Sequence, residues 1–506
     1  MKYRSERVEL IYNNRSLAVR MRHQHAETPF QPRDFPLHKP FSKDPITEQS
    51  LQHSIKDGVA FSIMAGVGEH YFSAYAVFLK ATTQQVGLLV ALPPLLASFA
   101  QMLAVVLGQV MGIRKGIIVL GALVQILGLL LVAILPGLFP DFSFSLLLFS
   151  VVLYFVGPNL GAPLWGSLMG ALVPENVRGR FFARRTRLSS IASFSALLLA
   201  GTILQLFDAL DMTPYGFLLI FAIGAVARGY SSYHLNRMYD PPRVHTLAST
   251  HERDGLPGPA LLRQYPNFLR FSLFFACMQF AVAISAPFVV VYLLRDLHFS
   301  YFELTMNTAA SVLMQFLVLN RWGRLGDLFG NRIILRLTGY SIPFMPALWV
   351  LSADFYYLLL VQMISGLVWS GYSLSSSNFL FDLTPPHRRA GLMATHNLFS
   401  SIAVFIGASV GGTLVLLLPT SIATSVGPWQ IAFGWSSVFF GVFLISCVSR
   451  LLIGFLFLPH IEEARVVKPM SYYGLVFRVT RFSPVSGVIF DVIARTRKRK
   501  KDTDDA

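Results

Sequence analysis

Glu69 is the residue in this sequence whose position most strongly suggests chemistry. It lies in an apolar stretch that runs from residue 55 to residue 79, and His70 follows it directly. A carboxyl group in such surroundings can take up and release a proton where water reaches it, and His70 could steady it or titrate with it. A hydrogen-bonded structural role is the alternative for both side chains. On a helix, Glu69 shares one face with small and polar residues at regular spacing, namely Ser62, Gly66, Ser73 and Ala76.

A second set of polar side chains lies in the second half of the chain. Ser365, Trp369, Tyr372, Ser373 and Ser376 fall on one face of a helix. Aromatic rings beside neutral hydroxyl groups suit an uncharged polar or amphiphilic ligand. Close helix packing is the alternative, because small hydroxyl residues let helices approach one another.

The elements that position these residues are expected to be membrane-spanning helices. Hydrophobic residues make up 54% of the 506 residues and charged residues 13%, whereas soluble domains contain roughly 25% charged residues. Twelve stretches reach the length of about 20 apolar residues that a bilayer requires. The sequence therefore predicts an all-α integral membrane protein. The expected spans are 55–79, 86–111, 116–136, 143–172, 188–207, 214–235, 268–294, 302–320, 333–352, 355–382, 391–418 and 430–458.

Lys and Arg residues lie almost entirely on one side of this arrangement. Of the 42 in the chain, only Lys80 and Arg295 fall in loops on the other side. Because basic loops stay in the cytoplasm, both termini are expected there. Arg228 and Arg450 lie within spans, near enough to the inner ends to snorkel, and are expected to have no special role.

The expected organisation has five segments. Two six-helix halves are joined by a cytoplasmic loop and flanked by two cytoplasmic tails, of which the N-terminal one is expected to be largely disordered and the C-terminal one is basic. The segments are the tail 1–54, the half 55–238, the loop 239–266, the half 267–458 and the tail 459–506.

The two halves repeat each other in sequence. The stretch 172–179 reads against 383–390 at an offset of 211, and the same offset aligns Ser189 with Ser400 and Gly201 with Gly412. Both matches follow the fourth span of a half. Two similar halves around a site at the middle of the membrane are typical of secondary transporters.

The loop between the eighth and ninth spans carries a recognisable motif. It reads Gly-Arg-Leu-Gly-Asp-Leu-Phe-Gly-Asn-Arg from Gly323 to Arg332 and matches the pattern G-x-x-x-D-x-x-G-x-R/K. The loop 174–180 matches a second recurrent pattern. With the repeat and the topology, these motifs make the chain from about residue 55 to 460 resemble the major facilitator superfamily. The equivalent first-half loop, 108–115, departs from the motif, because it is shorter and lacks the aspartate.

The resemblance implies a secondary active transporter that moves a small solute by alternating access. Glu69, with His70 beside it, would couple transport to protons. Seven residues of the two motif regions would form an inner gate: Gly323, Asp327, Gly330, Arg332, Arg178, Gly179 and Arg389. The first, fourth, seventh and tenth spans would line the central cavity. This implies wall positions at Tyr154, Asn159, Trp165, Gln279, Trp369, Tyr372, Ser376 and Asn378, with helix packing as the alternative for each.

The expected partners are the solute, protons and the lipid bilayer. The sequence has no nucleotide-binding Gly-rich loop and no metal-ligand spacing, so we expect no cofactor, no metal and no enzymatic activity. Nucleic acid is not an expected partner, and the protein is expected to be a monomer in the cell (inner) membrane. The alternative is a non-transporting protein of the same fold, such as an assembly factor or a sensor, which the departure at 108–115 and the long tails would fit.

Overall fold

The structure is a computed structural model. It describes residues 40–110, 114–174, 177–241, 262–385, 388–419, 422–425, 432–435 and 437–463. The chain divides into two compact units, Met1–Lys43 and Asp44–Ala506. All helices described below belong to the second unit.

The N-terminal half contains the first six expected spans. The first is divided between two helices, and each of the others is one continuous helix. In order they are α2 (Pro45–Gly68) with α3 (Phe72–Phe78), α4 (Thr83–Val110), α5 (Arg114–Leu138), α6 (Ser143–Leu172), α7 (Arg178–Ala209) and α8 (Thr213–Arg237), with the short η1 (Pro140–Phe142) before α6.

The C-terminal half repeats this plan. Its first span is also interrupted, after α10. The elements are α10 (Pro266–Ala283), η3 (Ala286–Phe288), α11 (Val289–Val291), η4 (Tyr292–Asp296), α12 (Tyr301–Phe329), α13 (Asn331–Ser341), α14 (Phe344–Leu351), α15 (Phe355–Leu383), α16 (Arg389–Leu417), α17 (Val438–Phe457) and η5 (Leu458–His460). Helices α6 and α15 end at Leu172 and Leu383, and α7 and α16 begin at Arg178 and Arg389, so the helix boundaries follow the offset of 211 seen in the sequence.

Eleven helical segments in the described part of the chain are long and apolar enough to cross a membrane. The segment formed by α2 and α3 is not among them, because α2 carries Lys56 and Asp57 and the helix breaks after Gly68. It nevertheless packs along α7 and α8 inside the bundle. We therefore count it as the twelfth span of the predicted arrangement.

Helix α2 begins earlier than the sequence analysis places it. The expected N-terminal tail, 1–54, is too long, since residues 45–54 are helical. Asp44 caps this helix, because its carboxylate accepts hydrogen bonds from the Thr47 hydroxyl (2.6 Å) and the Thr47 amide (3.0 Å). These bonds hold the pKa of the Asp44 carboxyl below its ordinary value. Charged residues in the first turns hid this start from an analysis based on hydropathy.

A two-stranded hairpin interrupts the connection before the last helix. Strands β1 (Ile422–Ser425) and β2 (Ala432–Trp435) pair antiparallel, with Ile422 opposite Trp435. The expected span 430–458 therefore starts too early, and α17 begins at Val438. The expected all-α fold holds for the membrane-spanning part, and this hairpin is the exception among the described residues.

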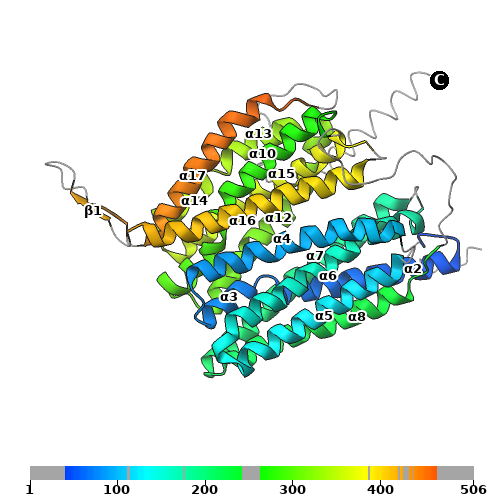
Figure 1. Cartoon of the computed structure of the whole chain (residues 1–506), viewed down its shortest axis with the longest axis horizontal. Coiled ribbons are helices and arrows are strands. Elements are labelled where there is room, and N and C mark those ends of the chain that lie inside the picture. Colours follow the sequence, from blue (N-terminus) through cyan, green and yellow to red (C-terminus); the bar gives the residue numbers. More distant parts are fainter. Residues whose placement is uncertain are drawn as a thin grey trace, which may run out of the picture. The chain divides into compact units, whose positions relative to one another are not determined.

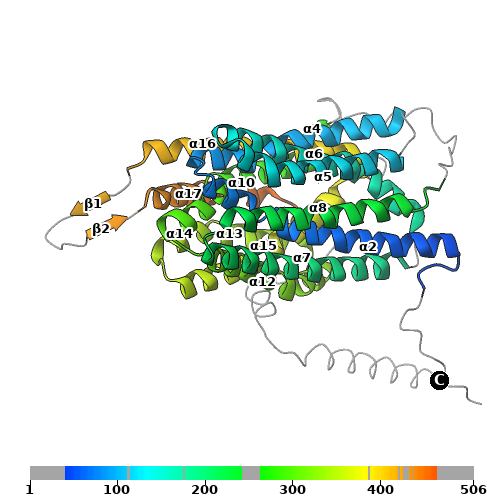
Figure 2. The same cartoon turned by 90° about the horizontal axis from the view of Figure 1, so that it is seen from below.

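The two halves meet along two pairs of helices. Helix α4 lies beside α16, and α7 lies beside α12, as the contacts and two views at right angles agree (Figures 1 and 2). We call the end of the bundle where α2 begins and α6 ends the basic end, because Arg114, Arg178 and Arg388 start or flank helices there. The other end, where α7 ends and α12 begins, is called the far end.

Glycines allow the closest helix contact in the N-terminal half. Gly121 of α5 and Gly157 of α6 each face the backbone of the other, so a Cβ atom on either would overlap the other's carbonyl oxygen. Both helices can approach at this point only because neither residue has a side chain. In a bilayer such packing replaces the hydrophobic effect as a source of helix association.

We predict that Gly157→Ala destabilises the folded protein. The added methyl group must push α5 and α6 apart, and overpacking of this kind costs about 1–3 kcal/mol. The melting temperature of the purified protein in detergent measures the effect. Gly170→Ala is the matched control, since a Cβ at Gly170 in the same helix meets nothing within 4 Å. Equal melting temperatures for the two variants would contradict the contact.

Candidate functional site

The polar face predicted around Glu69 lies where the first span breaks. Helix α2 ends at Gly68 and α3 begins at Phe72, with a turn between them. The buried Tyr154 of α6 donates a hydrogen bond from its hydroxyl to Glu69 Oε1 at 3.0 Å. Glu69 and His70 both have exposed surface, although many protein atoms lie around them. Glu69 is thus a carboxyl group inside the bundle that water can reach.

A cavity of about 730 Å³ opens between the two halves toward the basic end. Its walls are the first half of α7, the middle of α12 and the second half of α15. Hydroxyl and amide groups line it, and Arg187 of α7 adds one cation. The polar positions include Ser190, Ser193, Gln315, Asn320, Ser373 and Ser377.

The deep part of this cavity lies close to the break in the first span. Gly66 packs against the carbonyl of Ser193, which lines the cavity. One turn further along, the Tyr71 hydroxyl donates a hydrogen bond to the Leu197 carbonyl at 2.7 Å. Glu69 lies between Gly66 and Tyr71 in sequence, and both of these residues contact α7.

The halves are in direct contact at the far end. The Tyr71 hydroxyl also lies 2.9 Å from Thr305 Oγ1 of α12, and a Cβ on Gly201 of α7 would overlap Thr305. The Phe302 amide donates to Gln205 Oε1 at 3.2 Å. Another cross-contact joins the Arg295 guanidinium to the Ala81 carbonyl. The halves are thus in contact at the far end, where a pocket of about 540 Å³ also lies between them, lined by residues such as Lys80 and Arg295.

The predicted gate motif forms the tight connection between α12 and α13. Gly330 has φ 85° and ψ 164°, a backbone conformation that residues other than glycine rarely adopt. Asp327 is exposed, and no ion pair joins it to another described residue. Arg332 donates its backbone amide to Glu463 Oε2 at 2.8 Å. The gate cluster that the motif implies is not assembled in this conformation.

Two predicted gate arginines occupy equivalent places in the two halves. Arg178 donates to the carbonyls of Gly170 (3.3 Å) and Val173 (3.4 Å), at the end of α6. Arg389 donates to the Thr384 carbonyl (3.1 Å), at the end of α15. Each arginine therefore caps the helix that precedes its own, which satisfies carbonyl groups and favours the negative helix end.

Gly179 and Gly323 are not crowded in this conformation. A Cβ at Gly179 meets nothing within 4 Å, and one at Gly323 meets only Leu374 Cδ2 at 3.8 Å. Neither glycine is required by a close contact here. Of the gate glycines, only Gly330 is explained by backbone geometry.

The predicted cavity residues of α15 face a different direction from the cavity at the basic end. Tyr372 is 1% exposed and stacks on Phe275 of α10, and Trp369 meets Tyr372 edge-on. Ser376 is buried on the same face. The neighbouring face, with Ser370, Ser373 and Ser377, lines the cavity instead. Several polar stripes run along α15, and the sequence did not reveal which one meets open space.

The remaining predicted wall residues are dispersed. Asn159 donates to the Phe155 carbonyl of its own helix at 2.8 Å, and Asn378 donates to Asn331 of the gate region at 3.4 Å. Gln279 lies in α10 with a buried Oε1 that has no partner among the described residues. Trp165 lines a separate pocket in the N-terminal half. Tyr154, bonded to Glu69, is the one that joins another predicted site residue.

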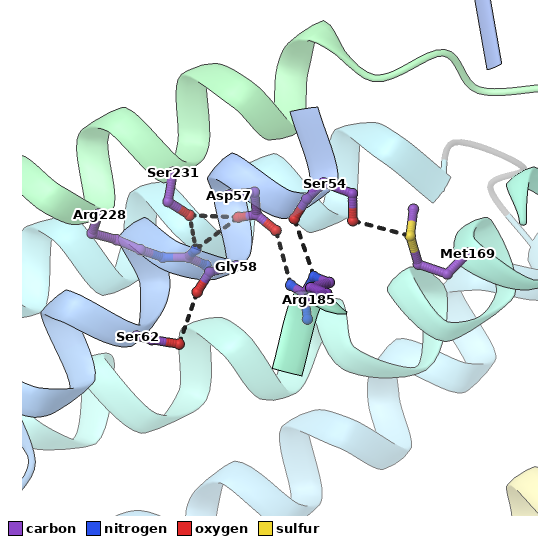
Figure 3. A network of polar contacts seen from close by, with 8 residues as sticks. All are labelled: Ser54, Asp57, Gly58, Ser62, Met169, Arg185, Arg228 and Ser231. Atoms are coloured by element: carbon purple, nitrogen blue, oxygen red, sulfur yellow. Dashed lines mark hydrogen bonds and ion pairs between the residues drawn. The ribbon is translucent and has the colours of Figure 1, made fainter. Parts of the chain in front are cut away.

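Sequence reasoning missed a buried charged cluster that Figure 3 shows. Asp57 of α2 faces Arg185 of α7 (Oδ2 to Nη2, 3.3 Å) and Arg228 of α8 (Oδ1 to Nη1, 3.9 Å). Ser231 links the group, because it donates to Asp57 Oδ1 and accepts from Arg228 Nη1, both at 2.6 Å. Arg185 also donates to the Ser54 carbonyl at 3.1 Å. Three charged residues within one half, each inside or beside an apolar stretch, were the available signal.

Two arginines expected to snorkel are buried instead. Arg228 is 5% exposed and points to Asp57, and Arg450 of α17 is 4% exposed. Arg450 donates to Ser285 Oγ at 2.8 Å and more weakly to the carbonyls of Val282 and Ile342, both at 3.4 Å. Both arginines face the interior of their own half, because helix packing there offers them polar partners.

The comparisons with known proteins agree with this geometry. The family model described as Major Facilitator Superfamily matches residues 271–482. The structure of nucleoside transporter NupG has 14% sequence identity and a TM-score of 0.60, covering 82% of this chain and 99% of that chain. The D-xylose-proton symporter has 14% identity and a TM-score of 0.62, covering 83% and 98%. A comparison with curated protein sequences gives no match.

A third solved structure is described by its conformation. A bacterial homolog to the human lysosomal transporter Spinster, in an inward-facing and unoccupied conformation, has 16% identity and a TM-score of 0.59, covering 85% of this chain and all of that chain. At these identities the likeness concerns the fold alone. It confirms the expected arrangement of helices.

Gly330→Ala is predicted to destabilise the connection between α12 and α13. An alanine at φ 85° and ψ 164° is strained by about 1–3 kcal/mol. Gly323→Ala in the same motif is the control, because a Cβ has room there and alanine favours a helix. The melting temperatures of both variants in detergent separate the two cases. A drop for Gly323→Ala that equals the drop for Gly330→Ala would contradict this assignment of strain.

Proposed function

Because residues 271–482 match the Major Facilitator Superfamily model and the fold resembles solved transporters of 14% identity, we propose that the chain belongs to this superfamily and is a secondary transporter that moves a small polar solute across the membrane by alternating access. The protein is a multi-pass integral membrane protein. The observation that carries the proposal is the contrast between its two ends. A cavity lined by both polar and apolar groups lies between the halves nearer the basic end, and hydrogen bonds join the halves at the far end.

This difference between the two ends corresponds to one of the two conformations of a transport cycle. A carrier exposes its site to one side at a time, so the far-end contacts must separate when the basic end closes. The contacts that would separate include two polar ones, Tyr71 with Thr305 and Phe302 with Gln205, and the aromatic pair of Phe217 and Tyr301.

The direction of the cavity follows from the charge of the loops. Lys80 and Arg295 are the only Lys or Arg residues in the far-end connections of the sequence. Because basic loops stay on the cytoplasmic side, the basic end and both termini face the cytoplasm. The conformation described here is then inward-facing, with the cavity open to the cytoplasm.

Glu69 is the group best placed to couple the solute to protons. It lies at the break between α2 and α3, its hydrogen-bond partner is the neutral Tyr154 hydroxyl, and no ion pair joins it to a described cation. Without a fixed counter-charge, its own proton is what balances its charge in a low-dielectric environment. Proton release and uptake would then accompany the change of access. His70 is next to it and could share in this exchange.

We expect Glu69→Gln to abolish proton coupling while leaving the fold intact. Glutamine keeps the shape and can still accept a bond from Tyr154, but it cannot exchange a proton. Concentrative uptake driven by a pH gradient in proteoliposomes should be lost, whereas equilibrium exchange of the solute should persist. Asp211→Asn is the matched control, because Asp211 is an exposed carboxyl in the far-end connection before α8. Unchanged gradient-driven uptake in Glu69→Gln would show that Glu69 is structural.

Gly201→Ala is expected to shift the protein away from the inward-facing state. The added methyl group overlaps Thr305, so α7 and α12 can no longer meet at the far end. With Cys277 and Cys447 replaced by serine, a Ser373→Cys probe in the cavity reports access from the cytoplasmic side. Its labelling rate with a membrane-impermeant maleimide in inside-out vesicles should fall severalfold in Gly201→Ala. Gly170→Ala should leave the rate unchanged, and an unaltered rate in Gly201→Ala would refute the far-end contact as a gate.

A further inference from the structure

The charged cluster around Asp57 borders a second pocket, separate from the cavity at the basic end. Its volume is about 240 Å³, and it lies inside the N-terminal half between α2, α5, α6, α7 and α8. Asp57, Arg185 and Arg228 line one part of it. Apolar groups line the rest, among them Phe61, Ile118, Trp165 and Leu235. The pocket is an apolar chamber with a charged wall.

The charges of this wall do not balance. Asp57 is one carboxylate against two guanidinium groups, so the cluster carries one excess positive charge. The Asp57 oxygen atoms are already used by Arg185 and Ser231, and Arg228 lies 3.9 Å from the nearer of them. The Nε of the buried Arg228 has no hydrogen-bond partner among the described residues. A buried cation with an unused donor is unfavourable unless an anion approaches it.

The two guanidinium groups are held in place by aromatic rings. Arg185 lies over Trp165 with its Cζ 4.6 Å from the ring centroid, and Arg228 lies over Phe61 at 5.0 Å. Gly58 leaves room for Arg185, since a Cβ there would lie 2.8 Å from its guanidinium. Arginines fixed by stacking and by hydrogen bonds form a pre-organised site rather than a mobile surface charge.

We propose that this pocket binds a small organic monoanion, a monocarboxylate with an apolar body. One negative charge makes the cluster neutral, whereas a neutral ligand leaves it positive and a dianion makes it negative. A carboxylate matches the fork of donors that a guanidinium presents. The apolar body fills the chamber formed by Phe61, Ile118 and Leu235. At about 30 Å³ per water-sized group, the chamber accepts a molecule of roughly the size of benzoate.

The proposal that this anion binds rests on the structure of the pocket alone. That the anion is also the transported solute rests on the transport function proposed above. In that case, the anion would pass from the cavity at the basic end into the half, past Trp165 and Arg185, which lie on the α6 and α7 side of the pocket.

Binding is tested first, with benzoate as the probe. Isothermal titration of the purified full-length protein in detergent should give saturable binding of benzoate. Benzamide has the same shape without the charge, and phenyl phosphate carries a second negative charge near neutral pH. Both should bind at least about tenfold more weakly than benzoate. Equal or tighter binding of either one overturns the charge argument.

Three variants locate the site. Arg228→Gln removes the guanidinium with the unused donor and should weaken benzoate at least about tenfold. Ala162→Phe keeps every charge and fills the pocket that Ala162 lines, so it should abolish binding even if Arg228→Gln proves unstable. Arg450→Gln removes another buried arginine, which lies in α17 outside this pocket, and should keep the affinity of the unaltered protein. Benzoate binding that survives Ala162→Phe, or that is lost in Arg450→Gln, places the anion elsewhere and overturns the proposal.

Flux measurements separate this inference from the transport function. Benzoate uptake into proteoliposomes that is lost in Ala162→Phe supports both. Uptake of neutral solutes with no benzoate binding overturns the anion site and leaves transport standing. Benzoate binding without flux of benzoate or of any neutral solute supports the site and contradicts transport.

Discussion

The Tyr71 hydroxyl group is one of the contacts that join the two halves at the far end. Tyr71 stands at the start of α3, immediately after the break in the first span, and its side chain reaches both α7 and α12. Because α2 ends where it does, this residue is free to bridge helices of both halves rather than follow one helix face. The break thus places an exposed carboxyl group on one side and the contact between the halves on the other. The Glu69 carboxyl group and the Tyr71 hydroxyl group that joins the halves are therefore only two residues apart in the sequence.

The sequence predicted the broad architecture because the hydrophobicity that a bilayer requires of a spanning helix is visible in a short stretch of sequence. Hydropathy located the spans, and the constant offset of 211 predicted helix ends such as Leu172 and Leu383. Hydropathy is a local signal, and the offset of 211 reflects a nearly exact repeat. The start of α2 was missed because its first turns carry charged residues, and the strand Ala432–Trp435 was missed because its apolar residues continue the apolar stretch of the last span.

The candidate site was only partly predictable, for a different reason. Glu69 was found because a carboxyl group in an apolar stretch is unusual wherever its partners lie. Asp57, Arg185 and Arg228 come from three helices, and no local pattern says that these helices meet. On α15 the periodicity offered several polar faces, and packing against Phe275 selected the one that is buried. Pairing between distant helices is the information that one sequence lacks.

The buried charge of Arg450 lies in the electric field across the membrane. Within the described residues it is surrounded by hydroxyl and carbonyl groups and by no carboxylate, so the C-terminal half carries a fixed positive charge inside the low-dielectric layer. A membrane voltage acts on such a charge with about 2.3 kcal/mol per 100 mV for a full crossing. If the halves rock as proposed, Arg450 moves through a fraction of that field, and the balance between the two facing states would then depend on the membrane potential, even for a solute that carries no charge.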